Sequence, residues 1–121
     1  MTRILYVDDE ADIREVAQMS LELDPALEVR TCASGAEAIA AAVAWRPDLI
    51  LLDVMMPGMD GPTVFAHLRG EPETAAIPVV FITARTQASE VDGFRRLGAR
   101  GILGKPFDPM TLAGQVRGFL E

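Results

Sequence analysis

The amino-acid sequence predicts one doubly wound α/β domain, residues 1–121, with a five-stranded parallel sheet and helices on both of its faces. Five short apolar, β-rich segments alternate along the chain with five segments of helical character. Alternation of this kind produces parallel strands that are joined by right-handed crossovers. Five such units commonly take the strand order 2-1-3-4-5, which makes strands one and three neighbours and opens a crevice at their carboxyl ends.

The first strand is expected over residues 3–7, a short apolar run that Asp8 ends. From Asp12 onward apolar residues recur at about the 3.6-residue helical period, and Pro25 ends this helix because proline lacks an amide hydrogen. The residues expected to face inward are Ile13, Val16, Ala17, Leu21 and Leu23. Residues 28–32 alternate in polarity, are rich in β-formers, and form the second strand.

A capping box marks the start of the second helix. The hydroxyl of Ser34 and the carboxylate of Glu37 can each satisfy a backbone amide that the helix leaves free. An alanine-rich helix follows to about Trp45, and Pro47 ends it. Residues 48–53 form the third strand, and their nearly continuous apolar run predicts that both faces of this strand are covered.

The third helix opens at Asp60-Gly61-Pro62, and a polar loop follows over residues 70–77. The residues of this helix that are expected to face inward are Val64, Phe65 and Leu68. Residues 78–83 form the fourth strand. The loop and the strand after it are consistent with a third β–α unit that returns to the same sheet.

The fourth helix is expected over residues 86–97, where Gly93 weakens it and Gly98 stops it. Residues 100–104 form a short fifth strand. Asp108-Pro109 then starts the last helix, with aspartate as its N-cap and proline at its first position. The residues of the last helix expected to face inward are Leu112, Val116, Phe119 and Leu120.

Composition restricts the partners and the compartment. The net charge is −7, which argues against a role in binding DNA or RNA, because neutralising nucleic-acid phosphates requires a basic surface. Cys32 is the only cysteine, which excludes an intrachain disulfide. The apolar start is too short for a signal peptide, and no apolar run reaches the ~18 residues of a membrane span. We therefore expect a cytoplasmic protein that binds neither nucleic acid directly nor a membrane.

Acidic side chains and one lysine are predicted to meet at the carboxyl edge of the sheet. Asp8 and Asp9 follow strand one, Asp53 ends strand three and Lys105 follows strand five. Two carboxylates ~4 Å apart repel by about 4 kcal/mol at an effective dielectric near 20, so a cation must offset their charge. Lys105 supplies one positive charge, and Mg²⁺ suits the remainder, with the backbone carbonyl of Met55 as a further oxygen ligand.

These groups together suit phosphoryl transfer, where catalysis is mainly positioning and charge stabilisation. Asp53 is the candidate nucleophile and would form an aspartyl phosphate. The three equatorial oxygens of the transferred group would then be held by Mg²⁺, by Lys105 and by the hydroxyl of Thr83, which ends strand four.

Four motifs, in this order and at this spacing, resemble those of the receiver domain of bacterial two-component response regulators, similar to the stand-alone chemotaxis type. They are Val7-Asp8-Asp9-Glu10, the run from Asp53 to Gly61, the run from Pro78 to Ala84, and Lys105-Pro106-Phe107. The resemblance covers the whole chain. The family has the flavodoxin-like strand order expected above, so the two expectations are not independent.

The resemblance implies that Asp53 accepts a phosphoryl group from a phosphohistidine on a histidine kinase or histidine phosphotransfer protein. It implies that Asp8 and Asp9 serve Mg²⁺, with Asp9 as the direct ligand, and that Thr83 and Lys105 read the phosphorylated state. The Lys105-Pro106 bond is expected to be cis. The output target is expected to bind the face made by helix four, strand five and helix five, and enzyme activity is limited to self-catalysed phosphorylation and dephosphorylation.

Ile102 departs from the family pattern, which often has a tyrosine or phenylalanine three residues before the lysine. A branched aliphatic side chain has no ring to rotate inward, so the sequence predicts no aromatic rotamer switch at this position. Arg85 lies two residues past Thr83. The resemblance places it at the entrance of the site, where its side chain could bind phosphate or a partner.

Several alternative functions remain open at this stage. A phosphate shuttle or sink in a phosphorelay would use the same residues as an output-binding switch. An aspartate-nucleophile phosphatase typically carries a second aspartate two residues after the first, and here that position is Met55. A flavin-binding module needs a glycine- and hydroxyl-rich loop after strand one, where this chain has acids. The chain carries no output domain, so its target lies in another molecule or in a longer protein.

Overall fold

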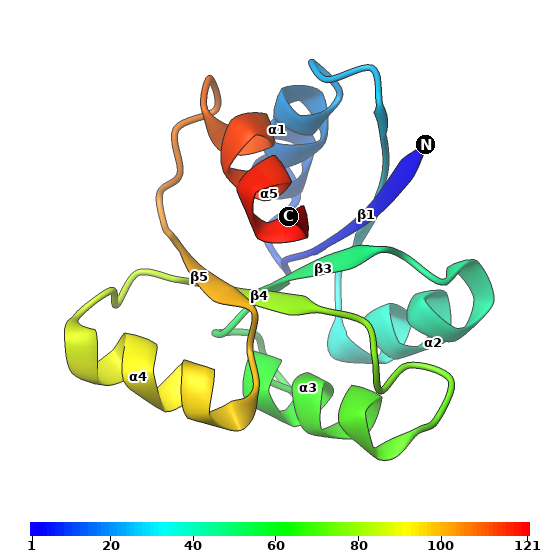
Figure 1. Ribbon diagram of the computed structural model, residues 1–121, viewed down its shortest axis with the longest axis vertical. Coiled ribbons are helices and arrows are strands. Elements are labelled where there is room, and N and C mark those ends of the chain that lie inside the picture. Colours follow the sequence, from blue (N-terminus) through cyan, green and yellow to red (C-terminus); the bar gives the residue numbers. More distant parts are fainter.

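Five parallel strands form one sheet in the computed structural model, which describes residues 1–121, and their order is β2-β1-β3-β4-β5 (Figure 1). The strands are β1 (Thr2–Val7), β2 (Leu27–Cys32), β3 (Leu49–Asp53), β4 (Val79–Thr83) and β5 (Gly101–Gly104). Each begins within two residues of its predicted position. The predicted fold class and strand order are both confirmed.

Five helices alternate with the strands and cover the sheet in two layers. They are α1 (Ala11–Leu21), α2 (Gly35–Trp45), α3 (Gly61–Gly70), α4 (Ala88–Leu97) and α5 (Leu112–Leu120). Helices α1 and α5 lie on one face, above the sheet in Figure 1, and α2, α3 and α4 lie on the other. This arrangement leaves the carboxyl ends of the strands uncovered by helices.

The sheet separates two apolar clusters. Successive strand side chains point to opposite faces, so Leu5 and Val7 join the cluster under α2 and α3, while Ile4 and Tyr6 join the cluster under α1 and α5. Every residue of β3 is buried, as its apolar sequence predicts. The central strand therefore holds Asp53 on a rigid support.

The helix ends follow the local sequence. The amide of Glu37 donates to the Ser34 hydroxyl at 3.2 Å, which confirms the cap of α2, although the Glu37 carboxylate accepts from that hydroxyl and not from a backbone amide. The carboxylate of Asp60 accepts from the amide of Thr63 at 2.9 Å and caps α3. Gly98 ends α4 with a positive φ of 108° that glycine readily adopts.

The predicted start of the last helix is wrong by three residues. The Asp108 carboxylate accepts from the Met110 amide at 2.9 Å, and its carbonyl accepts from the amides of Thr111 and Leu112. These bonds close a turn over residues 109–111, and α5 begins only at Leu112. Aspartate before proline favours a turn as well as a helix start, and here the turn forms.

The predicted inward face of the first helix is also partly wrong. Val16 is 41% exposed, because the buried face of α1 is formed by Ala17, Ser20 and Leu21. Leu23 is 66% exposed and lies beyond the helix, which ends at Leu21. Ser20 is compatible with burial since its hydroxyl donates to the Val16 carbonyl at 2.7 Å. The apolar side chain of Val16 is therefore left at the surface.

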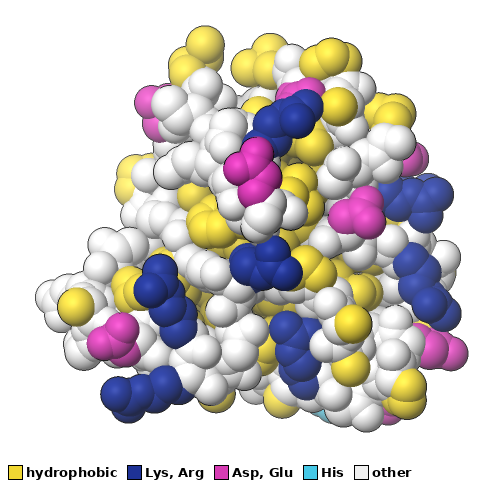
Figure 2. All heavy atoms as spheres, in the orientation of Figure 1, with side chains coloured by type: hydrophobic (Ala, Val, Ile, Leu, Met, Phe, Trp, Pro, Cys, Tyr) yellow, Lys and Arg dark blue, Asp and Glu magenta, His cyan; other side chains and the backbone are white.

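Charged side chains of both signs are interspersed over the face seen in Figure 2, and the basic ones do not gather there into one patch. That face offers no continuous positive surface to a nucleic-acid backbone. None of the helices is both long enough and apolar enough to cross a membrane.

Gly61 is required by a close approach of two backbone segments, and its substitution tests this part of the fold. A Cβ atom on Gly61 would lie 2.6 Å from the carbonyl oxygen of Asp53 and 2.9 Å from Cα of Val54. We expect Gly61→Ala to lower the free energy of unfolding by about 1–3 kcal/mol, measured by urea denaturation, because backbone must move. In the control Gly114→Ala, in the first turn of α5 where a Cβ meets open space, the same change is expected to raise it by up to about 1 kcal/mol. An unchanged midpoint for Gly61→Ala would contradict the packing described.

Candidate functional site

The carboxyl ends of β1 and β3 lie side by side in the middle of the sheet. Val7, the last residue of β1, pairs with Leu52 of β3, so Asp8 and Asp53 follow at the same level. The chain leaves β1 toward β2 on one side and places β3 on the other, which is where a binding crevice opens in folds of this kind. Strand β4 pairs with β5 on its other side, where Thr83 of β4 lies opposite Gly104, the residue before Lys105.

The ammonium group of Lys105 joins three carboxylates at this edge. Its Nζ atom lies 3.1 Å from Oδ2 of Asp8, 3.2 Å from Oδ2 of Asp53 and 3.6 Å from Oε1 of Glu10. Asp8 is completely buried and Asp53 is 2% exposed, whereas Glu10 lies at the surface. The structure thus brings Asp8, Asp53 and Lys105 together, as their positions after the strands predict.

Further groups hold Asp8, and sequence reasoning did not single them out. The Tyr6 hydroxyl donates to Oδ2 of Asp8 at 3.2 Å, and the Glu10 amide donates to Oδ1 at 3.0 Å. The Arg14 guanidinium donates to the Asp8 carbonyl at 2.8 Å. The two-residue alternation of a strand places Tyr6 on the same side as Asp8, and this is the one sequence signal that could have indicated their contact.

Burial and crowding of negative charge shift the pKa values at the site. Burial, and then the charge of Asp8, raise the pKa of Asp53, and the attraction of Lys105 only partly offsets them. For Lys105, burial disfavours the ammonium, but hydrogen bonds and attraction to Asp8 and Asp53 prevail and raise its pKa. Burial and the neighbouring Asp8 also raise the pKa of the Tyr6 phenol, which therefore stays protonated.

A cluster of oxygen donors beside this ammonium fits a hard divalent cation. One carboxylate oxygen from each of Asp8, Asp9 and Glu10 lies within 4.8 Å of the others. Mg²⁺ prefers such ligands and keeps several waters, and the exposed Asp9 and Glu10 leave room for them. Asp53 stands outside this cluster, and the Met55 amide donates to its Oδ1 at 3.2 Å.

Thr83 is not joined to the acidic groups by a hydrogen bond. It ends β4 and is 5% exposed, and its hydroxyl accepts from the Arg85 amide at 3.0 Å, which closes a short turn. The Arg85 side chain extends into solvent, where its guanidinium lies 3.9 Å from the carboxylate of Glu90. In this structure Thr83 shapes its own loop.

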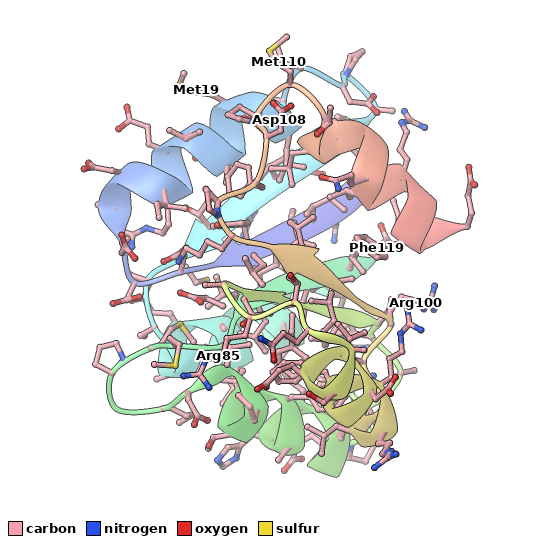
Figure 3. All side chains as sticks on the ribbon, turned by 90° about the vertical axis from the view of Figure 1, so that its left-hand side faces the viewer. Met19, Arg85, Arg100, Asp108, Met110 and Phe119 are labelled. Atoms are coloured by element: carbon pink, nitrogen blue, oxygen red, sulfur yellow. The ribbon has the colours of Figure 1, made fainter.

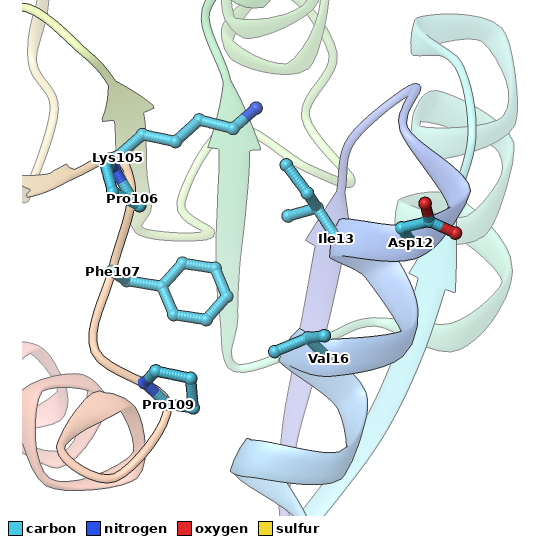
Figure 4. A pocket seen from close by; sticks show the side chains of 7 residues that line it. All are labelled: Asp12, Ile13, Val16, Lys105, Pro106, Phe107 and Pro109. Atoms are coloured by element: carbon cyan, nitrogen blue, oxygen red, sulfur yellow. The ribbon is translucent and has the colours of Figure 1, made fainter.

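An apolar groove of about 210 Å³ adjoins the site between α1 and the segment that follows β5. It is lined by Asp12, Ile13, Val16, Lys105, Pro106, Phe107 and Pro109. Figure 4 shows the Lys105 side chain along its upper rim, with the Phe107 ring pointing toward α1. The Lys105-Pro106 peptide bond is cis, as the resemblance implies. Exposed Met19 and Met110 lie at the same end of the molecule (Figure 3).

Removing the charge of Asp53 is expected to stabilise the fold when no divalent cation is present. The ordinary pKa is 3.8 and burial raises it, so folding is favoured at low pH and loses stability as pH rises through the raised value. With chelator, Asp53→Asn should raise the melting temperature by about 2–8 °C at pH 7, the shift that ~1 kcal/mol produces in domains near this size.

The gain should be larger at pH 7 than at pH 4.5, because more of the wild-type Asp53 is protonated at the lower pH. Thermal unfolding followed by circular dichroism measures both values. A wild-type chain more stable than the variant at pH 7 would show that the attraction of Lys105 outweighs burial.

The sequence is similar to those of known response regulators. The model of the response regulator receiver domain family matches residues 4–117. The chain is 40% identical over 122 residues to the DNA-binding dual master transcriptional regulator RpaA of Synechocystis sp., covering all of this chain and 50% of that protein. It is 46% identical over 118 residues to the response regulator PleD of Caulobacter vibrioides, covering 95% of this chain and 25% of that protein. The chain thus spans half or less of these relatives.

Solved structures share the complete fold. The chemotaxis response regulator CheY4 of Vibrio cholerae superposes with a TM-score of 0.89 at 34% identity, covering 98% of both chains. A putative response regulator from Chloroflexus aurantiacus gives a TM-score of 0.86 at 34% identity, covering 98% of this chain and 97% of the other. The chain therefore belongs to the family of response regulator receiver domains, which serve as phosphoryl acceptors in two-component signalling.

Proposed function

We propose that this receiver domain takes a phosphoryl group onto Asp53 from a phosphohistidine of a partner histidine kinase or histidine phosphotransfer protein. The observation that carries the proposal is the placement of Asp53, a nearly buried carboxylate at the sheet edge, 3.2 Å from the ammonium of Lys105. A rigid carboxylate beside a fixed positive charge suits in-line attack on a phosphoryl group.

In the transfer, a carboxylate oxygen of Asp53 forms a bond to phosphorus as the phosphorus–nitrogen bond of the donor breaks. The imidazole nitrogen leaves with the electron pair of that bond, and the phosphoryl oxygens keep their negative charge. The Lys105 ammonium already donates to Oδ2 of Asp53 at 3.2 Å, and it would contact one of the phosphoryl oxygens after transfer. The chain thus catalyses its own phosphorylation and its slow dephosphorylation, and needs no further enzyme activity.

Asp8 and Asp9 would hold Mg²⁺, with Asp53 and the Met55 carbonyl as further oxygen ligands. The exposed Glu10, whose carboxylate lies within the same cluster, extends this set. The metal supplies positive charge that neutralises the carboxylates and the incoming phosphoryl oxygens. Asp9 is the better direct ligand because it is exposed, whereas Asp8 is buried and already carries three hydrogen bonds.

Thr83 reads the phosphorylated state by exchanging partners. Its hydroxyl now accepts from the Arg85 amide, and it would turn to donate to a phosphoryl oxygen on Asp53. That exchange releases the turn before α4, so the loop and the helix move. The output target would bind the face formed by α4, β5 and α5, which is the face that such a movement alters.

A phosphate shuttle or sink is the second candidate function, and Ile102 is the observation that favours it. Ile102 is partly buried against the α3 and α4 side of the sheet, and it has no aromatic ring to rotate between two positions. A receiver that only passes phosphate onward requires no such switch. Binding of a target that depends on phosphorylation would favour the output-binding role instead.

Phosphorylation by a small donor tests the assigned nucleophile. Incubation with acetyl phosphate and Mg²⁺ should add one phosphoryl group, detected by intact mass spectrometry. Asp53→Asn should abolish the addition because the amide is not a nucleophile, and chelation of Mg²⁺ should abolish it in the wild type. The control Asp92→Asn changes an exposed residue of α4 and should label normally. Labelling that persists in Asp53→Asn would assign the phosphate to another residue.

The phosphohistidine donor would pack against the apolar groove beside Lys105. Lys105 borders both the groove and the site, so a donor that reaches Asp53 with its histidine also covers the surface next to it. The groove is mostly apolar and includes the exposed Val16, and the exposed Met19 and Met110 lie at the same end of the molecule (Figure 3). An amphipathic helix of the donor would bury these side chains, which is how helices commonly bind apolar grooves.

Two valines of equal exposure provide a matched test of donor docking. Val16 of α1 is 41% exposed beside the groove, and Val43 of α2 is 39% exposed on the other face of the sheet. We expect Val16→Asp to slow phosphotransfer roughly tenfold, the effect of ~1.4 kcal/mol of lost docking energy, and Val43→Asp to leave it unchanged.

The donor in this experiment is the purified histidine kinase of the host genome that phosphorylates the wild-type chain fastest. Both variants should label normally with acetyl phosphate, which does not need the groove. Equal slowing by the two valine variants, or slowing by neither, would contradict docking at α1.

A further inference from the structure

The buried carboxylate of Asp8 receives all of its hydrogen bonds from groups of the protein. Oδ1 accepts from the Glu10 amide at 3.0 Å. Oδ2 accepts from the Lys105 ammonium at 3.1 Å and from the Tyr6 hydroxyl at 3.2 Å. Asp8 has no exposed surface, so solvent does not replace a partner that is lost. These three donors therefore fix the orientation of the Asp8 carboxylate.

Of the three donors, only the Lys105 ammonium also interacts with other carboxylates. Its ammonium also lies 3.2 Å from Asp53 and 3.6 Å from Glu10, on a flexible four-carbon chain. In the proposed transfer, a phosphoryl group on Asp53 would attract this ammonium away from Asp8. The Glu10 amide and the Tyr6 hydroxyl then remain as the donors that keep Asp8 in place.

Tyr6 offers its hydroxyl from a fixed position. It is the only tyrosine of the chain, it is fully buried, and its ring packs in the cluster under α1 and α5. The edge of the ring meets Phe107, with the ring centroids 6.3 Å apart and an interplanar angle of 77°. A phenylalanine would provide the same packing, so the specific contribution of the tyrosine is its hydrogen bond to Asp8.

We propose that Tyr6 is a positioning residue of the cation site, and that its hydroxyl fixes the orientation of the buried Asp8 carboxylate beside Asp9, the direct ligand, so that the two aspartates serve Mg²⁺ together. This inference rests on the proposed function, in which these two aspartates serve the metal. Groups that hydrogen-bond to a metal ligand fix its orientation, and their loss weakens metal binding. Tyr6 thereby links the apolar core under α1 and α5 to the acidic edge.

The variant Tyr6→Phe tests this role because it keeps the ring and removes only the hydroxyl. We expect the dissociation constant for Mg²⁺, measured by isothermal titration calorimetry, to rise about tenfold, as when an outer hydrogen-bond partner of a metal ligand is removed. The matched control is Thr74→Val, which removes another buried hydroxyl, one that donates to the Leu68 carbonyl at 2.6 Å away from the site. Thr74→Val should lower stability and leave Mg²⁺ affinity unchanged.

A second measurement uses the wild-type chain and does not depend on whether the variant folds. With carbon-13 at Cζ of tyrosine, the single Tyr6 resonance reports the hydrogen bond to Asp8. Addition of Mg²⁺ should shift this resonance, and KCl at equal ionic strength should not. A resonance that both salts leave unchanged would overturn the proposal.

Two further outcomes separate this inference from the proposed function. If the wild type binds Mg²⁺ and Tyr6→Phe binds it equally well or more tightly, the hydroxyl is only a satisfied core group and the inference is overturned alone. If the wild-type chain binds no Mg²⁺ and does not label with acetyl phosphate, the proposed function is overturned and this inference with it.

Discussion

One ammonium group holds two buried carboxylates at the edge of the sheet, and the fold is arranged to keep these three groups together. The strand order places β1 and β3 side by side, so Asp8 and Asp53 emerge next to each other. Because β4 lies between β3 and β5, the side chain of Lys105 crosses the end of β4 to reach Asp53. The flexible four-carbon side chain of lysine is long enough to span that width.

The site has more negative than positive charge, and this imbalance would favour the binding of a cation. Burial raises the pKa of Asp53 even though Lys105 is a neighbour, which means that the folded state tolerates this carboxylate at a cost in stability. A site whose charges were balanced internally would gain little from a cation or from the charge redistribution of phosphoryl transfer. The buried charge of Asp53 therefore lowers the stability of the folded domain. Such a loss is common where a fold carries a functional group.

Sequence patterns were sufficient for the strands and for the caps of α2 and α3. They were also sufficient for the meeting of Asp8 and Asp53 with Lys105, because strand ends in a parallel sheet share one edge. They were insufficient where two local hydrogen-bond patterns compete. Asp108 before proline could start a helix or close a turn, and the turn forms. Thr83 could face the acidic groups or its own loop, and it accepts from Arg85. The contact of Tyr6 with Asp8 depends on a buried ring orientation that only tertiary packing decides.

Helix α4 is the element that a change at Thr83 would move most easily. It contains no buried residue, and its clearest anchor is Phe94, whose ring lies 4.8 Å from that of Phe81. Phe81 lies on β4 two residues before Thr83 and pairs across the sheet with Ile102. An element with few buried contacts costs little to displace. The aromatic contact between β4 and α4 therefore offers a mechanical connection from the acidic edge to the proposed output face that does not require an aromatic ring at position 102.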